Sequence, residues 1–220
     1  MASWMIHLRI ADKLLDRIPG LSPIEFIMGN MAPDSGVPNA DWTQFSPSTA
    51  VSHFRVDDGT GKRQIDLEAY LERYFSPAQR TNYNERQYAF YLGYYTHLLT
   101  DCCWSDLVSW PARQKFPDTS MQVIKKDWYD QDFLYLRNHP GFRAFRAYLG
   151  SVGFVNTYMD FFAPDAFDNR REYITSFYLQ ENDHLDREYP YLTEAEADRF
   201  VADAIAEILT TITEFLIISS

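Results

Sequence analysis

A histidine and an aspartate four residues apart form the pair in this sequence that is best placed to do chemistry. His97 and Asp101 lie in an apolar segment, residues 88–110, with no Gly or Pro between Tyr94 and Trp110. If this segment is helical, both side chains project from one face about one turn apart. An imidazole and a carboxylate placed in this way suit a metal ion. A core histidine that hydrogen-bonds a nearby aspartate would have the same spacing, so both interpretations stay open.

Further histidines and carboxylates in the N-terminal half favour the metal. The chain has five histidines; His7 lies in a predicted first helix, and His53 shares a loop-like stretch with Asp34. With His97 and Asp101 they make five candidate ligands for zinc, manganese or iron. Five ligands exceed one tetrahedral zinc and suggest two ions that share a carboxylate. Paired ions of this kind activate water and clamp the oxygens of a phosphoryl group.

The elements that must position these residues are predicted to be helices. The stretch 29–61 is rich in Gly, Pro, Asn and Asp, which indicates a long irregular loop, and Trp110-Pro111 is expected to end the central helix. No alternating strand pattern occurs. Apolar periodicity and capping signals predict helices over residues 4–18, from Ser22-Pro23 to near Gly29, and over 65–75, 88–110, 121–136, 142–149, 152–162, 169–180 and from Thr193 onward. We therefore predict one all-α domain spanning residues 1–220, a multi-helix bundle with a long loop in its N-terminal half.

Charge and cysteine content narrow the possible partners and compartment. The net charge of −11 argues against stable nucleic-acid binding, which needs clustered Lys and Arg, but bound cations would still permit a phosphate-ester substrate. The adjacent Cys102 and Cys103 cannot form an ordinary disulfide with each other; we expect them to be buried thiols in a reducing compartment. The N-terminus lacks the features of a signal peptide, and no apolar run is long enough for a transmembrane helix. These observations predict a cytoplasmic protein.

The order of the candidate ligands resembles the zinc-dependent phospholipase C family, which shares its all-helical fold with the P1/S1-type nucleases. The likeness covers roughly residues 4–110 and rests on His7, Met28-Gly29-Asn30-Met31-Ala32-Pro33-Asp34-Ser35, Ser52-His53-Phe54 and Gly93-Tyr94-Tyr95-Thr96-His97-Leu98-Leu99-Thr100-Asp101.

The resemblance implies a ligand set and a mechanism. Asp34, His53, His97 and Asp101 would bind one zinc, and Asp101 would bridge to a second zinc held also by His7. Water activated by the two ions would attack the phosphorus of a phosphodiester, because zinc lowers the pKa of bound water and polarises the phosphoryl oxygen. Asp34 is in addition a candidate general base.

The sequence departs from the family in two places. Secreted members present a tryptophan at the mature N-terminus, whose amino and carbonyl groups ligate the second zinc; Trp4 is internal here. They also carry a third zinc on two histidines and an acidic residue. His184 and Glu188 have the required spacing, but Leu107 stands where the partner histidine is expected. We therefore expect His184 to be an exposed histidine in a polar stretch.

These features predict a zinc-dependent, phospholipase C-like hydrolase acting on a small phosphate ester or a phospholipid head group. Three alternatives stay open: a P1-type nuclease or nucleotide phosphodiesterase, a non-catalytic metal-binding helical protein, and a structural protein whose histidines and aspartates satisfy one another. An aromatic pocket that stacks a base would favour the first alternative, and metal binding without turnover the second. The basic residues Lys125, Lys126, Arg143 and Arg146 could contact a phosphate, but are expected on solvated helix faces.

Overall fold

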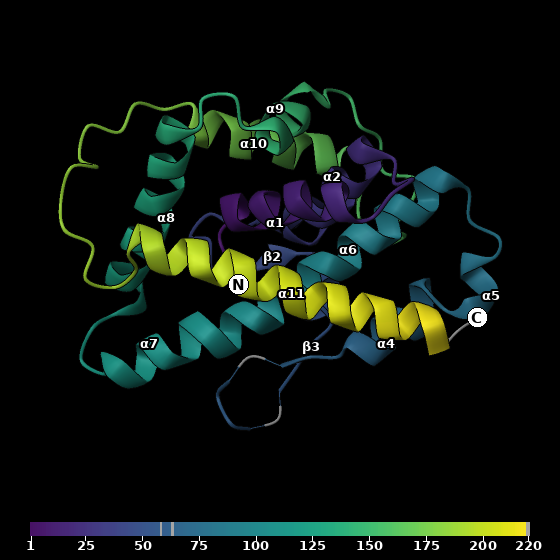
Figure 1. The fold of residues 1–220 in the computed structure, drawn as a ribbon, viewed down its shortest axis with the longest axis horizontal. Helices are drawn as coiled ribbons and strands as arrows, with labels where there is room; N and C mark the ends of the chain where they lie inside the picture. The colour runs from purple at the N-terminus through teal and green to yellow at the C-terminus, as the bar shows by residue number, and fades with distance from the viewer. Residues whose placement is uncertain (58, 63, 219–220) are drawn as a thin grey trace.

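Helices dominate the computed structural model, which describes residues 1–57, 59–62 and 64–218 (Figure 1). The helices are α1 (Trp4–Arg17), α2 (Pro23–Met31), α3 (Thr49–Ser52), α4 (Leu67–Tyr74), α5 (Pro77–Arg80), α6 (Glu85–Trp104), α7 (Trp110–Lys115), α8 (Met121–Asn138), α9 (Arg143–Gly150), α10 (Ala166–Tyr178) and α11 (Glu194–Ile218). A 3₁₀ turn, η1 (Ala32–Ser35), follows α2, and a π turn, η2 (Ser105–Ser109), follows α6. The predicted all-α class is confirmed.

The predicted long loop contains more regular structure than expected. Helix α2 continues past Gly29 to Met31 and leads into η1. Beyond it, β1 (Val37–Pro38) pairs antiparallel with β2 (Phe45–Ser46), and β3 (Arg55–Val56) pairs with β4 (Gln64–Ile65). These two-residue strands are too short to give an alternating sequence pattern.

The prediction of the helices is wrong in two places. The central helical segment does not end at Trp110-Pro111, because η2 joins it to α7. Pro111 lies in the first turn of α7, where a missing N–H is tolerated. The predicted helix over residues 152–162 is absent. The Asn156 amide donates to the carbonyls of Met159 and Phe162 at 2.7 and 2.9 Å, which gives the backbone an alternative to helical hydrogen bonds.

Helix α6 forms the centre of the core. Every residue from Ala89 to Asp101 is buried, and α1, α2, α4 and α11 all pack against this helix. The yellow C-terminal helix α11 runs alongside α1 and α6 (Figure 1). Its start is fixed as predicted, because Thr193 and Glu196 exchange the hydrogen bonds of a capping box.

The tightest contact in this core is the crossing of α2 and α6 at two glycines. A Cβ atom on Gly29 would lie 2.1 Å from the carbonyl oxygen of Phe90, and one on Gly93 would lie 2.2 Å from the carbonyl oxygen of Phe26. Only glycine permits so close an approach of two backbones. Beside this crossing, the Asn30 side-chain amide donates to Thr96 Oγ1 at 2.9 Å. The end of α2 is therefore fixed against the part of α6 that carries His97.

A buried carboxylate connects the start of α1 to α8 and α10. Asp132 accepts hydrogen bonds from Ser3 Oγ at 2.7 Å and from the Tyr178 hydroxyl at 2.6 Å. Burial raises the pKa of Asp132 to about 7, although both hydrogen bonds and nearby Arg9 oppose this. The folded protein therefore holds a proton on Asp132 more tightly than the unfolded chain does.

We expect the free energy of unfolding to fall as the pH rises from about 4 to about 7, because the folded state must then give up this proton. The difference from an ordinary aspartate corresponds to about 4 kcal/mol. Asp132→Asn is expected to remove this part of the pH dependence and to be more stable than the parent protein above about pH 7. Urea unfolding in the presence of chelator measures the difference between the two proteins. Asp183→Asn, at an exposed aspartate, is the control. If the free energy of unfolding changed with pH equally in Asp132→Asn and in the parent protein, the prediction would be contradicted.

Candidate metal centre

All five predicted ligand residues meet in one place, the histidine–aspartate cluster (His7, Asp34, His53, His97 and Asp101). His7 comes from α1, Asp34 from η1, and His53 directly follows α3. His97 and Asp101 lie one turn apart on α6, as their spacing predicted. The cluster is buried: His7 and His97 are fully covered, and the Asp34 side chain is 6% exposed.

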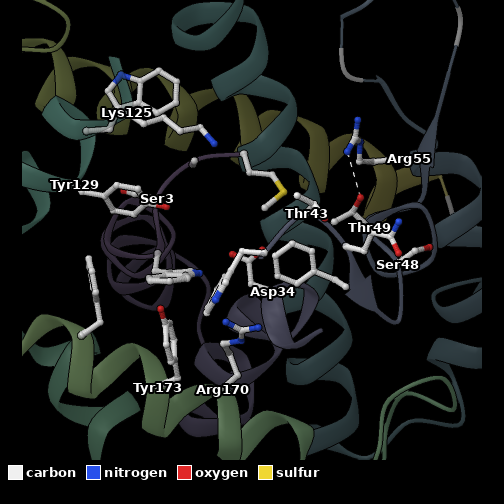
Figure 2. A pocket seen from close by; sticks show the side chains of 18 residues that line it. Ser3, Asp34, Thr43, Ser48, Thr49, Arg55, Lys125, Tyr129, Arg170 and Tyr173 are labelled. Atoms are coloured by element: carbon white, nitrogen blue, oxygen red, sulfur yellow. Dashed lines mark hydrogen bonds between the residues drawn. The ribbon is translucent and has the colours of Figure 1, made fainter. Parts of the chain in front are cut away.

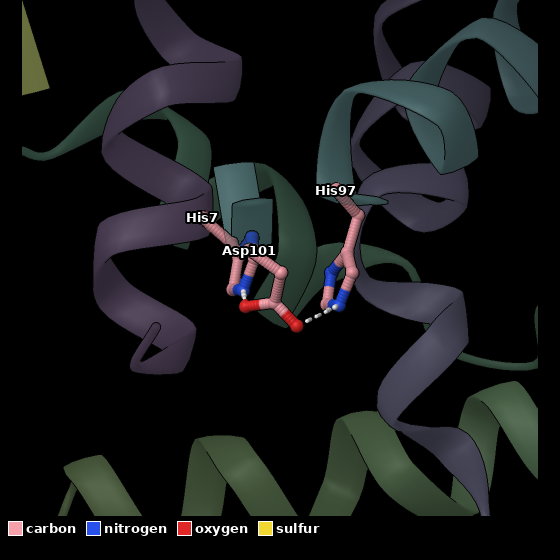
Figure 3. Close-up of side chains that lie close together, drawn as sticks. All are labelled: His7, His97 and Asp101. Carbon is pink, nitrogen blue, oxygen red and sulfur yellow. Dashed lines mark ion pairs between the residues drawn. The ribbon is translucent and has the colours of Figure 1, made fainter. Parts of the chain in front are cut away.

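The ring nitrogens and carboxylate oxygens of the cluster face one another at short distances. His53 Nε2 lies 3.2 Å from Asp34 Oδ1 and 3.3 Å from His97 Nε2. The His7 and His97 rings stack with their centroids 3.8 Å apart, and the Asp101 carboxylate lies beside both rings, facing their Nε2 atoms (Figure 3). Its Oδ1 is 3.4 Å from His7 Nε2, and its Oδ2 is 3.8 Å from His97 Nε2. Oδ2 is also 3.9 Å from His53 Nε2.

Hydrogen bonds outside the cluster orient two of its imidazoles. His97 Nδ1 lies 2.7 Å from the carbonyl oxygen of Asn30. A carbonyl oxygen can only accept, so Nδ1 carries the proton and Nε2 presents its lone pair to the cluster. His53 Nδ1 contacts Ser52 Oγ at 2.9 Å, which leaves its Nε2 facing Asp34. Histidines that bind metals are oriented by outer partners of this kind.

Three members of the cluster, Asp34, His97 and Asp101, have the charge states of metal ligands. Burial lowers the pKa of His97 to about 3, so its imidazole is neutral. Burial alone would raise the pKa of Asp34, but contact with His53 and the nearby His97 hold it below its ordinary value. The pKa of Asp101 is likewise low despite burial, because the Met1 amino group and His7 stabilise its charge. Neutral imidazoles and ionised carboxylates are the forms that bind metals.

Unpartnered buried atoms indicate that the cluster fits a cation. Among the described residues, neither ring nitrogen of His7 nor Asp101 Oδ2 has a hydrogen-bond partner, whereas buried polar atoms normally have one. Two atoms bound to one tetrahedral zinc lie about 3.3 Å apart, close to the shortest separations here. The ligand atoms fall into two sets, each within 4.8 Å: His7, His97 and Asp101, and Asp34, His53 and His97. The donors present therefore fit a divalent metal.

The N-terminal segment reaches the cluster through Ala2 rather than through Trp4. The backbone N–H of Ala2 donates to Asp101 Oδ1 at 2.7 Å. The Trp4 ring instead packs against aromatic rings of α8 and α10, with its closest centroid 5.7 Å away at Phe177. The contact with Asp101 is therefore made by the backbone of Ala2, while the Trp4 side chain packs away from the cluster.

The remaining histidines and the two cysteines are not members of the cluster. His184 and Glu188 are exposed in the segment between α10 and α11, and the described residues form no potential metal site there. His139 is exposed, with Nδ1 at 2.9 Å from the carbonyl oxygen of Tyr135. The two cysteines are free thiols; burial raises the pKa of Cys102 to about 12 and that of Cys103 to about 11. Neutral thiols are poor ligands.

A pocket of about 740 Å³ borders the cluster at Asp34 and was not predicted (Figure 2). Its wall comes from the start of α1, the β1–β2 hairpin, α8 and α10. It is rich in aromatic and basic side chains, among them Trp42, Tyr129, Tyr173, Phe177, Arg55, Lys125 and Arg170. The spacing of Arg170, Tyr173 and Phe177 along α10 was the available signal, since residues three and seven apart share a helix face.

Two of the basic residues have different environments. Lys125 is partly exposed on α8 and lines the pocket. Arg143 instead pairs with Asp12 and Asp16, each at 2.9 Å, away from this pocket. Of the four basic residues considered in the sequence, Lys125 is therefore the one that lines this pocket.

The family model described as zinc dependent phospholipase C matches residues 6–113. This segment contains the whole cluster and confirms the resemblance drawn from the sequence. No curated protein and no solved structure matches the chain. In the part of the chain that is described, no helix has the length and hydropathy needed to span a membrane.

Proposed function

We propose that this chain, whose residues 6–113 belong to the zinc-dependent phospholipase C family, hydrolyses phosphate esters with the help of two metal ions at the histidine–aspartate cluster. The observation that carries the proposal is the convergence of three imidazoles and two carboxylates beside a pocket. Zinc is the expected metal, and manganese or iron would accept the same donors.

The arrangement of donors favours Asp101 as the residue shared by both ions. A neutral imidazole offers one lone pair and can hold only one ion, whereas the two oxygens of a carboxylate can bind separate ions. Asp101 Oδ1 faces His7, while Oδ2 faces His53 and His97. His7 would then hold one ion, and Asp34, His53 and His97 the other.

The side chains around the ions have separable tasks. Bound divalent ions would supply the Lewis acid that polarises a phosphoryl oxygen and makes water nucleophilic near neutral pH. Asp34 is the cluster member that lines the pocket, so a phosphate ester entering there meets its carboxylate. Because that carboxylate is ionised, Asp34 is both a ligand and a candidate proton acceptor. The Asn30 carbonyl holds His97 in the tautomer that can ligate.

Metal content measured together with hydrolysis tests this proposal. Protein purified without chelator or a nickel column is expected to contain about two divalent ions per chain and to release nitrophenolate from para-nitrophenyl phosphate esters. His97→Ala should lose metal and activity together, because it removes a central donor. His139→Ala, which changes an exposed histidine outside the cluster, should retain both. A parent protein that takes up no metal on reconstitution would end the proposal; metal without turnover would indicate a non-catalytic metal-binding protein.

A nucleotide phosphodiesterase of P1 type is the second candidate. The aromatic side chains of the pocket favour it, because a base can stack on such rings. This candidate would be supported if the metal-loaded protein hydrolysed a dinucleotide faster than it hydrolyses para-nitrophenyl phosphate esters.

The cytoplasmic location of the protein also stays a prediction.

A further inference from the structure

Arg170 is a buried cation without a carboxylate partner. Its side chain comes from α10 and the residue is 6% exposed. In the described part of the chain no carboxylate forms an ion pair with it, whereas its neighbour Arg171, 7% exposed, pairs with Asp168 at 2.7 Å. Asp34 attracts the guanidinium without ion-pair contact, and a buried charge that lacks such contact is costly. In a chain with 31 acidic and 20 basic residues, this arrangement points to a ligand.

Three contacts hold the Arg170 guanidinium at the pocket wall. It donates to the carbonyl oxygen of Gly36, which directly follows η1 and so lies two residues from Asp34. It also lies 5.7 Å from the ring centroid of Trp42 and 5.3 Å from that of Tyr173. Figure 2 shows Arg170 and Tyr173 pointing from α10 into the pocket, toward Asp34. The cation is therefore positioned beside the cluster.

Trp42, which contacts Arg170, has an unusual backbone conformation. Its φ of +60° lies in the left-handed region, which bulky residues rarely occupy. The residue is 44% exposed, so burial of the ring does not explain the conformation. The turn between β1 and β2 imposes this conformation, and in it the Trp42 N–H donates to the carbonyl oxygen of Asn39 at 3.1 Å. Here it accompanies the packing of the Trp42 ring against Arg170 and Tyr173.

The charge of the pocket disfavours a quaternary ammonium group, such as that of choline, as an occupant. Arg55, Lys125 and Arg170 line it, and Asp34 is the one acidic residue among its described lining residues. Arg55 Nε is buried without a hydrogen-bond partner there. A quaternary ammonium group would meet three cations. Two of the aromatic rings of the pocket, those of Trp42 and Tyr173, already make cation–π contacts with Arg170.

We propose that Arg170 is the specificity-determining residue of this pocket and that the site takes phosphate esters with two or more negative charges, in preference to zwitterionic choline esters. This inference rests on the proposed hydrolytic function. A guanidinium can hold two oxygens of such an anion at once. The anion would be bound between Arg170 and the cluster, with the remaining cations of the pocket around it.

Three esters with the same leaving group test the preference. Para-nitrophenyl phosphate is a dianion at mildly alkaline pH, bis-para-nitrophenyl phosphate is a monoanion, and para-nitrophenyl phosphorylcholine is net neutral. We expect kcat/KM to be highest for the dianion and at least about tenfold lower for the choline ester. Faster hydrolysis of the choline ester than of the dianion would overturn the proposal.

Variants at Arg170 assign the preference to this residue. Arg170→Gln is expected to raise KM for the dianion about 10- to 100-fold, the loss typical of a hydrogen bond to a charged group, and to leave KM for the choline ester nearly unchanged. Arg170→Lys should restore part of the preference. Arg171→Gln is the matched control, because it lies next in the same helix, equally buried but paired with Asp168. An equal loss for all three esters in Arg170→Gln would show that Arg170 does not select charge.

Binding without turnover separates this inference from the proposed function. If no ester is hydrolysed, titration calorimetry with phenylphosphonate still reports on the pocket. The inference is supported if the parent protein and Arg171→Gln bind phenylphosphonate and Arg170→Gln binds it about tenfold more weakly or worse. Equal binding by all three proteins, or binding by none of them, would overturn it. Phosphate release from glycerol 3-phosphate or from vesicles containing phosphatidic acid then identifies a soluble or a lipid-borne dianion as the source.

Discussion

Asp101→Asn is expected to lower hydrolysis of para-nitrophenyl phosphate by about 10³-fold or more and to reduce the metal content. The reason is its position: its two oxygens face different histidines, Oδ1 toward His7 and Oδ2 toward His53 and His97. An amide has one oxygen and no charge, so it cannot hold two cations. Loss of the stabilisation that paired ions give a phosphoryl transition state costs several kcal/mol, which corresponds to a rate factor of about this size.

A matched control is available a short distance along the chain. Asp106→Asn makes the same change of charge in η2, where the Asp106 side chain is 57% exposed and pairs with Lys62 at 2.7 Å. We expect this variant to keep the metal content and rate of the parent. Atomic absorption and initial rates measured on both variants give the comparison. Full metal content with activity within threefold of the parent in Asp101→Asn would rule out a bridging role.

The cluster could be predicted because its chemistry is carried by rare residue types in a fixed order. Histidines are few in this chain, and one turn of helix brings His97 and Asp101 together without any tertiary information. His7, Asp34 and His53 were candidates by residue type, and the family resemblance supported grouping them with this pair, since nothing local brings α1, η1 and α3 to α6. The structure places all five side chains together.

The pocket could not be predicted in the same way. Its wall combines α10 with the β1–β2 hairpin and α8, and the contact of Arg170 with Trp42 joins residues far apart in sequence. Aromatic and basic residues are also common on ordinary helix faces, so their presence alone has little diagnostic value. The fold errors have a similar origin: side-chain bonds of Asn156 replaced a predicted helix, and a π turn carried the chain past Pro111.

Gly93→Ala is expected to destabilise the protein by about 3 kcal/mol or more and to weaken metal binding with it. The added methyl group would lie 2.2 Å from the carbonyl oxygen of Phe26 and 2.9 Å from the backbone nitrogen of Asn30. Both obstacles are backbone atoms of α2, so relief requires the two helices to separate. Separation would pull the Asn30 carbonyl away from His97 Nδ1, now at 2.7 Å, and would loosen the imidazole that faces the metal site. Urea unfolding and zinc titration measure the two effects.

The control for this prediction is a second helical glycine with open space around it. Gly150 is the last residue of α9, and a Cβ there would meet no atom within 4 Å. Gly150→Ala is therefore expected to be neutral or to stabilise the protein by up to about 1 kcal/mol, because alanine loses less conformational entropy on folding. If Gly93→Ala matched Gly150→Ala in stability and zinc affinity, the close crossing of α2 and α6 would not be what positions His97. If only Gly93→Ala lost stability and zinc affinity, the backbone contact between α2 and α6 would be what positions the metal centre.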